Sequence, residues 1–127
     1  MRGCRFSNTR LLTASLVGCA LLQASPLSVA GSASGIVTYF VPFDIGGQEA
    51  FVFRLSTMNS DAPACNTSNR FVVTAANPRF KMFFASILAA SMSNTPIYVY
   101  GSGSCTIYDN ASENLAYICL GSTPYPC

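Results

Sequence analysis

The sequence predicts one small, mainly β domain with a single α-helix, in the element order β-β-β-α-β-β. Short segments rich in β-branched and aromatic residues alternate with turns that contain glycine and asparagine, which is typical of strands. One longer segment, residues 77–93, instead repeats its apolar side chains with the period of a helix. We expect the five strands to form a curled sheet, a closed barrel that leaves few strand edges exposed.

The first thirty residues have the pattern of an export signal and are excluded from the predicted fold. Three arginines precede an apolar run over residues 11–22, and the small-residue segment SVA ends at Ala30. The run is shorter than the roughly 20 apolar residues that a membrane span needs. This pattern predicts cleavage after Ala30 and a secreted or periplasmic domain, residues 31–127. Alternatively, LVGC resembles the bacterial lipoprotein box, which would anchor the protein through a lipid on Cys19.

The charge of the predicted mature domain excludes one class of partner. Four basic residues stand against five acidic ones after residue 30, which gives a net charge of −1. A nucleic-acid-binding domain is expected to show a basic stripe, and the sequence has none. We therefore expect no nucleic-acid partner.

Four cysteines lie outside the leader, and in an exported chain they predict two disulfides. They are Cys65, Cys105, Cys119 and Cys127. Four cysteines allow three pairings. We favour Cys65 with Cys105 and Cys119 with Cys127, because the tail between the last two is rich in glycine and proline and can fold back. The sequence has no histidine and no CxxC pair, so a zinc site is not expected.

The first two predicted strands form a hairpin. They are GIVTYFVPF, residues 35–43, and QEAFVFRLS, residues 48–56. Between them, Gly46 and Gly47 supply the positive φ angles of a tight turn. Alternation along the second strand places Phe51, Phe53 and Leu55 on its inner face.

A turn-rich loop, residues 57–69, and a third strand, residues 70–75, lead to the helix. Asn77 followed by Pro78 is a helix start signal, and we expect the helix to end at Asn94 because Pro96 prevents its continuation. The predicted buried face consists of Phe80, Phe83, Phe84, Ile87, Leu88 and Ser91. The opposite face is built of small or weakly polar residues and predicts self-association through Met82, Ala85, Ser86 and Ala89.

Three strand-like segments follow the helix, at residues 97–101, 105–108 and 115–120, although the predicted order counts only two strands there. The first runs into the glycines of YVYGSGSC, residues 98–105. A phosphate-binding loop needs such glycines between a strand and a helix, but here a strand-like segment follows. We therefore interpret Gly101 and Gly103 as a bulge or bend that aims Cys105 at Cys65.

No residue set in the sequence identifies a reaction, so we expect a protein that is not an enzyme and has no cofactor or metal. The absence of histidine excludes Ser-His-Asp and Cys-His catalysis. Asp109 and Glu113 are candidates for a carboxylate pair, or for a calcium site together with Asn110. Both lie in DNASEN, whose composition is that of a solvated turn, so these alternatives are minor.

Tyrosines are the most informative side chains for binding. Tyr98 and Tyr100 share one face of their strand, and Tyr39 lies in the first strand. Sugars bind to such rings through CH contacts, supplemented by polar side chains. We take Tyr98, Tyr100 and Tyr39 as candidate ligand-binding residues, although tyrosines also pack across strands in many β-rich domains.

From Gly35 onward, the chain resembles the B subunits of AB-type toxins, such as subtilase cytotoxin and typhoid toxin. The resemblance rests on the element order, on the late cysteine pair and on the helix-then-strand segment NPRFKMFFASILAASMSNTPIYVYG. The chain also resembles small exported bacterial proteins of unassigned function that share RFVV, YVYGSGSC and an acidic loop before AYI. The toxin subunits are five-stranded OB-fold barrels that assemble as rings of five. Their tyrosine-tyrosine-serine stretch near the mature N-terminus is replaced here by GSASG.

The resemblance implies a binding module for a cell-surface glycan, assembled as a homo-oligomer of five, with a toxin A subunit as a further partner. The alternative is a structural or protein-protein interaction protein of the cell envelope that binds no sugar. Fold likeness alone does not establish either function.

Overall fold

The predicted order of elements is confirmed. The computed structural model describes residues 29–58 and 61–121 of the 127-residue chain. The elements are β1 (Ser32–Ile45), β2 (Gln48–Met58), β3 (Phe71–Thr74), α1 (Phe80–Ser93), β4 (Ile97–Gly101) and β5 (Glu113–Leu120). The predicted strand boundaries move by a few residues, and the largest change is at β1, which begins three residues before Gly35.

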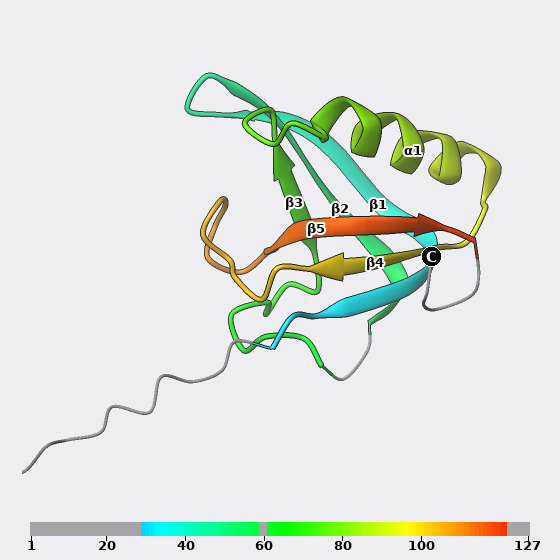
Figure 1. Cartoon of the computed structure of the whole chain (residues 1–127), viewed down its shortest axis with the longest axis horizontal. Coiled ribbons are helices and arrows are strands. Elements are labelled where there is room, and N and C mark those ends of the chain that lie inside the picture. Colours follow the sequence, from blue (N-terminus) through cyan, green and yellow to red (C-terminus); the bar gives the residue numbers. More distant parts are fainter. Residues whose placement is uncertain (1–28, 59–60, 122–127) are drawn as a thin grey trace, which may run out of the picture.

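The five strands form one sheet that closes on itself in the order β1-β2-β3-β5-β4 (Figure 1). Closure depends on β1, whose first four residues pair with β4 while the strand also pairs with β2 along its length. The strand bends at Gly35, where φ is 107° and the register with β2 shifts. A side chain at this position would collide with Ser56, so the bend requires glycine. Among the strand pairs in the described part of the chain, only β3 and β5 run parallel.

The predicted hairpin turn joins β1 to β2. Gly46 and Gly47 have φ angles of 57° and 81°, the two positive values that a tight two-residue turn needs. From this turn the register runs without interruption from Ile45 opposite Gln48 to Tyr39 opposite Arg54. The turn therefore sets which face of each strand points inward.

The core lies between the inner face of the sheet and α1. Phe51, Phe53 and Leu55 are buried there as predicted. The ring of Phe51 contacts Phe80 and Phe84 of the helix, with centroid distances of 5.4 and 5.6 Å. The helix thus covers the aromatic side of the hairpin and excludes water from it.

The predicted helix is confirmed, with one error in its buried face. The helix begins at Phe80, and the side chain of Asn77 accepts a hydrogen bond from the backbone N–H of Arg79 just before it. It ends as predicted at Asn94, which adopts the left-handed conformation (φ 51°). Leu88, predicted to be buried, is 37% exposed, and Ala90 is buried instead. The buried side chains of the helix are Phe80, Phe83, Ile87 and Ala90, and the partly buried Phe84 packs beside them against the core.

Residues 105–108 do not form the strand that their sequence suggests. They belong to a loop between β4 and β5 that bends around one side chain, that of Asn114. Asn114 accepts a hydrogen bond from the N–H of Ile107 and donates to the hydroxyl oxygens of Ser104 and Thr106. The ring of Tyr108 packs outside the sheet on Phe43, at 4.8 Å between centroids. These tertiary contacts override the local β propensity.

The predicted disulfide between Cys65 and Cys105 is confirmed, and it joins loops 40 residues apart. Cys127, the predicted partner of Cys119, lies outside the described residues. Residues 1–28 of the predicted leader, which include Cys19, also lie outside them. In the described part of the chain, no helix is long and apolar enough to cross a membrane. A disulfide is consistent with an oxidising compartment outside the cytoplasm.

Candidate functional site

Three tyrosines form a patch on the outer face of the closed sheet, which we call the tyrosine patch. In β4, Ile97 and Val99 point into the core, so the alternate residues Tyr98 and Tyr100 point outward. The register places Tyr117 of β5 directly opposite Tyr100. The patch therefore consists of Tyr98, Tyr100 and Tyr117, and the core does not use their rings.

The three rings lie in a row. The centroids of Tyr98 and Tyr100 are 5.0 Å apart, and those of Tyr100 and Tyr117 are 4.5 Å apart with the ring planes within 21° of parallel. The ring of Tyr117, at one end of the row, is 37% exposed. Stacked rings restrain one another, so the patch presents a preformed aromatic surface rather than three independent side chains.

Polar groups adjoin the tyrosine patch on the side of β1. Ser32 pairs with Tyr100 in the sheet, and its hydroxyl donates to both carboxylate oxygens of Asp61, at 3.2 and 3.1 Å. Asp61 is also close enough to act on Tyr100 electrostatically. The pKa of the Tyr100 phenol is raised above its ordinary value of 10.0 by desolvation, then by a hydrogen bond with Tyr98 and by the nearby Tyr98, Tyr117 and Asp61 charges.

Of the three predicted ligand-binding tyrosines, the structure brings two together. Tyr98 and Tyr100 lie in the tyrosine patch, whereas Tyr39 lies on β1 opposite Arg54, beyond the bend. Among the described residues, no ring contact joins Tyr39 to the patch. Sequence reasoning did not single out Tyr117 or Asp61. The alternation along β5 places Tyr117 on the outer face, but its position opposite Tyr100 depends on the register.

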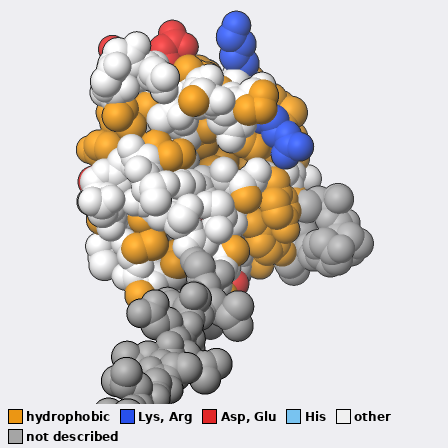
Figure 2. All heavy atoms as spheres, turned by 60° about the vertical axis from the view of Figure 1, so that its left-hand side comes forward, with side chains coloured by type: hydrophobic (Ala, Val, Ile, Leu, Met, Phe, Trp, Pro, Cys, Tyr) orange, Lys and Arg blue, Asp and Glu red, His pale blue; other side chains and the backbone are white. Residues whose placement is uncertain are grey.

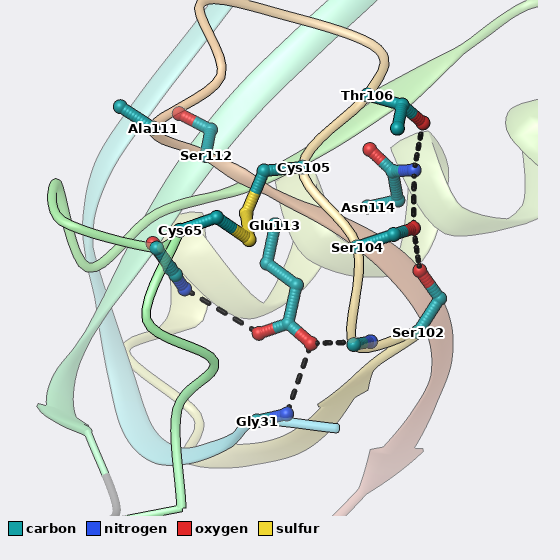
Figure 3. Close-up of a disulfide and its surroundings, with 12 residues drawn as sticks. Gly31, Cys65, Ser102, Ser104, Cys105, Thr106, Ala111, Ser112, Glu113 and Asn114 are labelled. Atoms are coloured by element: carbon teal, nitrogen blue, oxygen red, sulfur yellow. Dashed lines mark hydrogen bonds between the residues drawn. A yellow bond between two sulfur atoms is a disulfide. The ribbon is translucent and has the colours of Figure 1, made fainter. Parts of the chain in front are cut away.

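The prediction that DNASEN is a solvated turn is wrong at Glu113, because the side chain of Glu113 is completely buried. It begins β5 at the end of the sheet where β4 ends and β1 begins. Its Oε1 accepts hydrogen bonds from the backbone N–H groups of Gly31 (2.9 Å) and Gly103 (2.8 Å), and its Oε2 accepts one from the Asn66 amide (3.4 Å). Figure 3 shows the Glu113 carboxylate between Gly31 and the disulfide, with dashed lines marking its hydrogen bonds.

The glycines around Glu113 are required by its carboxylate. A Cβ on Gly101 would collide with Oε1, and a Cβ on Gly31 would collide with Oε2. The bulge predicted at the glycines is confirmed by a register shift between Tyr100 and Gly101, and Gly103 has a φ of 78°. The glycine loop therefore does direct an N–H group at an anion, and that anion is the protein's own Glu113.

Asp109 and Glu113 do not form a carboxylate pair. Asp109 forms an ion pair with Arg70 at 2.7 Å and accepts a hydrogen bond from the backbone of Ala111. Glu113 faces the opposite way, into the protein. Among the described residues, no group of three or more acidic, cysteine or histidine side chains is arranged to hold a metal ion.

The predicted interface residues lie beside a shallow groove on the outside of the helix. Ala85, Ser86 and Ala89 line this groove of about 400 Å³ with the exposed Leu120 at the end of β5, and Met82 is 54% exposed. A second groove of about 470 Å³ lies between the hairpin and the start of the helix, where Phe43, Ala50 and Phe84 form an apolar floor beside Asp44, Glu49 and Lys81. Figure 2 shows one face of the molecule, on which charged side chains are few and lie mostly at the upper rim.

The comparisons with known proteins add no relative: no family model matches the chain, and no curated protein or solved structure matches it.

Proposed function

We propose that the protein is an exported, non-enzymatic module that binds a cell-surface glycan at the tyrosine patch. One observation carries this proposal. Three rings lie in a row on the outside of the sheet, with Tyr100 and Tyr117 stacked, and they are not part of the hydrophobic core; the carboxylate of Asp61 lies nearby. Aromatic faces bind the CH groups of sugars, while carboxylate and hydroxyl oxygens accept and donate hydrogen bonds to sugar hydroxyls.

The architecture supports the finer interpretation. The closed five-stranded sheet with its one helix after the third strand supports an assignment as an OB-fold, a fold whose sheet face commonly binds oligosaccharides. We propose this fold assignment together with the likeness to toxin B subunits, including assembly as a ring of five and delivery of a toxin A subunit.

Self-association is proposed through the helix. Ala85, Ser86 and Ala89 are small enough for the backbone of a second copy to approach closely, and Leu120 and the 80%-exposed Met92 offer apolar area beside them. Replacing Ala89 with arginine is expected to convert an oligomer to monomers in light scattering, whereas the charge reversal Lys81→Glu outside the groove leaves the mass unchanged.

A glycan array with the mature protein tests the function. We expect binding to a defined set of sialylated or neutral glycans, and at least about tenfold weaker binding for Tyr100→Ala and Tyr117→Ala. Tyr39→Ala serves as the matched control, because it removes an exposed tyrosine from the same sheet but outside the patch. If glycan binding were lost only in Tyr39→Ala, the binding site would lie around Tyr39 and not at the tyrosine patch. A folded protein that binds no glycan would favour the alternative, an envelope interaction protein.

A further inference from the structure

Glu113 is a buried carboxylate without a cationic partner. It is fully buried, and among residues 29–58 and 61–121 no lysine or arginine forms an ion pair with it. Its three partners are two backbone N–H groups and one side-chain amide. Burying an unpaired carboxylate is costly even when it is hydrogen-bonded, so this arrangement lacks the positive charge that would normally offset it.

The nitrogen of Gly31 is one of these three donors, and it becomes an amine if the chain is cut before it. It lies 2.9 Å from Oε1 of Glu113, and Gly31 is the residue that follows the predicted leader. The exposure of the chain changes at the same place: Val29 and Ala30 are exposed, whereas Gly31 and Ser32 are buried. The Ala30–Gly31 bond thus joins an accessible segment to one that is packed inside the fold.

We propose that cleavage after Ala30 creates a buried ion pair between the new α-ammonium group of Gly31 and the carboxylate of Glu113. In this step an export peptidase hydrolyses the peptide bond. The hydroxyl of water goes to the Ala30 carbonyl, a hydrogen goes to the Gly31 nitrogen, and the resulting amine takes a further proton from solvent at neutral pH. This inference rests on the export that is part of the proposed function.

The surroundings of Gly31 suit this role. Its carbonyl oxygen accepts a hydrogen bond from the N–H of Gly101 at 2.8 Å, which holds the residue in place before and after cleavage. A side chain at position 31 would collide with Glu113 Oε2 and crowd Pro63, so only glycine brings the terminal nitrogen this close. Any added residue would carry the ammonium group one residue, about 3.5 Å, away from the carboxylate.

The consequence is that removal of the leader adds the last stabilising interaction of the fold, the ion pair between Gly31 and Glu113. In the precursor, Gly31 donates a neutral amide hydrogen bond to Glu113. In the mature chain, the same nitrogen donates as a cation, which adds a Coulomb attraction between opposite charges to the hydrogen bond with the carboxylate. Removal of the leader is therefore expected to stabilise the end of the sheet at which β1, β4 and β5 meet.

The test starts with the full chain, exported by a bacterial host so that the leader is removed in the cell. The mature mass is expected to begin at Gly31. In the folded protein, acylation of the terminal amine is expected to be at least about tenfold slower than in urea, because reaction requires local opening. A mature chain that begins elsewhere, or a terminal amine that reacts equally fast in both states, would overturn the proposal.

A double-mutant cycle then separates the ion pair from general crowding. One threonine inserted between Ala30 and Gly31, with the new first residue verified by mass, is expected to lower Tm by about 5 °C or more. In the Glu113→Gln background the same insertion is expected to have little effect. Equal losses in both backgrounds would refute the ion pair, and if Glu113→Gln does not fold, the acylation result decides. If the Gly31 amine is protected but the protein binds no glycan, the proposed function is refuted and the ion pair is not.

Discussion

The buried end of the sheet around Glu113 and the tyrosine patch outside it both involve β4 and β5, but they tolerate substitutions very differently. Around Glu113, two glycines cannot accept a Cβ, and each hydrogen-bond donor has a fixed place. In the tyrosine patch, the ring contacts join the three tyrosines to one another, and none of the three belongs to the hydrophobic core. The first region is explained by folding, whereas the second is not, and for this reason the second is the better guide to function.

The largest effect is expected from Gly101→Ala. The new methyl group would overlap Glu113 Oε1 and displace the carboxylate from its donors. Overpacking costs about 1–3 kcal/mol and each lost hydrogen bond to a charged group about 1.5–3 kcal/mol, so the free energy of unfolding should fall by about 4–6 kcal/mol. Urea unfolding measures this change. The neighbouring exposed variant Ser102→Ala should stay within about 0.5 kcal/mol of the parent, and a Gly101→Ala protein of unchanged stability would refute the constraint.

Removal of the disulfide is expected to have the next largest effect. The double variant Cys65→Ser and Cys105→Ser frees a loop closed over 40 residues of separation, which corresponds to about 4 kcal/mol of unfolding free energy by loop-closure entropy. Thermal unfolding with and without a reducing agent checks it. The parent protein should become reductant-sensitive at this end of the sheet, and a variant as stable as the parent would show that the hydrogen bonds around Glu113 suffice.

A smaller effect on stability is expected within the tyrosine patch. Tyr117→Ala removes one stacked ring pair, and such pairs contribute about 0.5–1.5 kcal/mol. Chemical unfolding of this variant next to Gly101→Ala compares the two regions directly. A loss from Tyr117→Ala as large as that from Gly101→Ala would mean that the patch is part of the folding core, and the functional interpretation of its rings would fail.

The smallest effect is expected from the ionisation of Tyr100. Because its folded pKa is raised above 10.0, the folded state holds the proton more tightly than the unfolded state. Its contribution to stability is therefore present below about pH 10 and is lost as the pH rises through the folded pKa. Ultraviolet titration of phenolate should show a tyrosine that ionises late, and this late component should be absent in Tyr100→Phe. A titration identical in the two proteins would contradict the shift.

The sequence predicted those parts of the fold that local chemistry determines. The glycine pair defined the hairpin turn, and Asn94 with Pro96 defined the end of the helix. The predictions that were wrong concern features that depend on distant residues. Residues 105–108 have strand propensity, but the side chain of Asn114 bends them into a loop. Leu88 follows the helical period, but in the folded chain it lies outside the stripe of helix residues that the core buries.

The candidate site was predictable only in part, for the same reason. Alternation along β4 placed Tyr98 and Tyr100 on one face, but the position of Tyr117 depends on the register between β4 and β5. The composition of DNASEN suggested a turn exposed to water, and it does not show that Glu113 points inward. Three glycines, at positions 31, 101 and 103, were the available signal for a buried group that needs space.

The pairing of β3 with β5 has a further consequence. It consists of only two residue pairs, Phe71 with Glu113 and Val72 with Asn114, and it is the one parallel junction in the ring. Every other junction has at least four pairs. Transient opening of the ring should therefore begin at this seam, and amide hydrogens along it should exchange with deuterium before those of the hairpin.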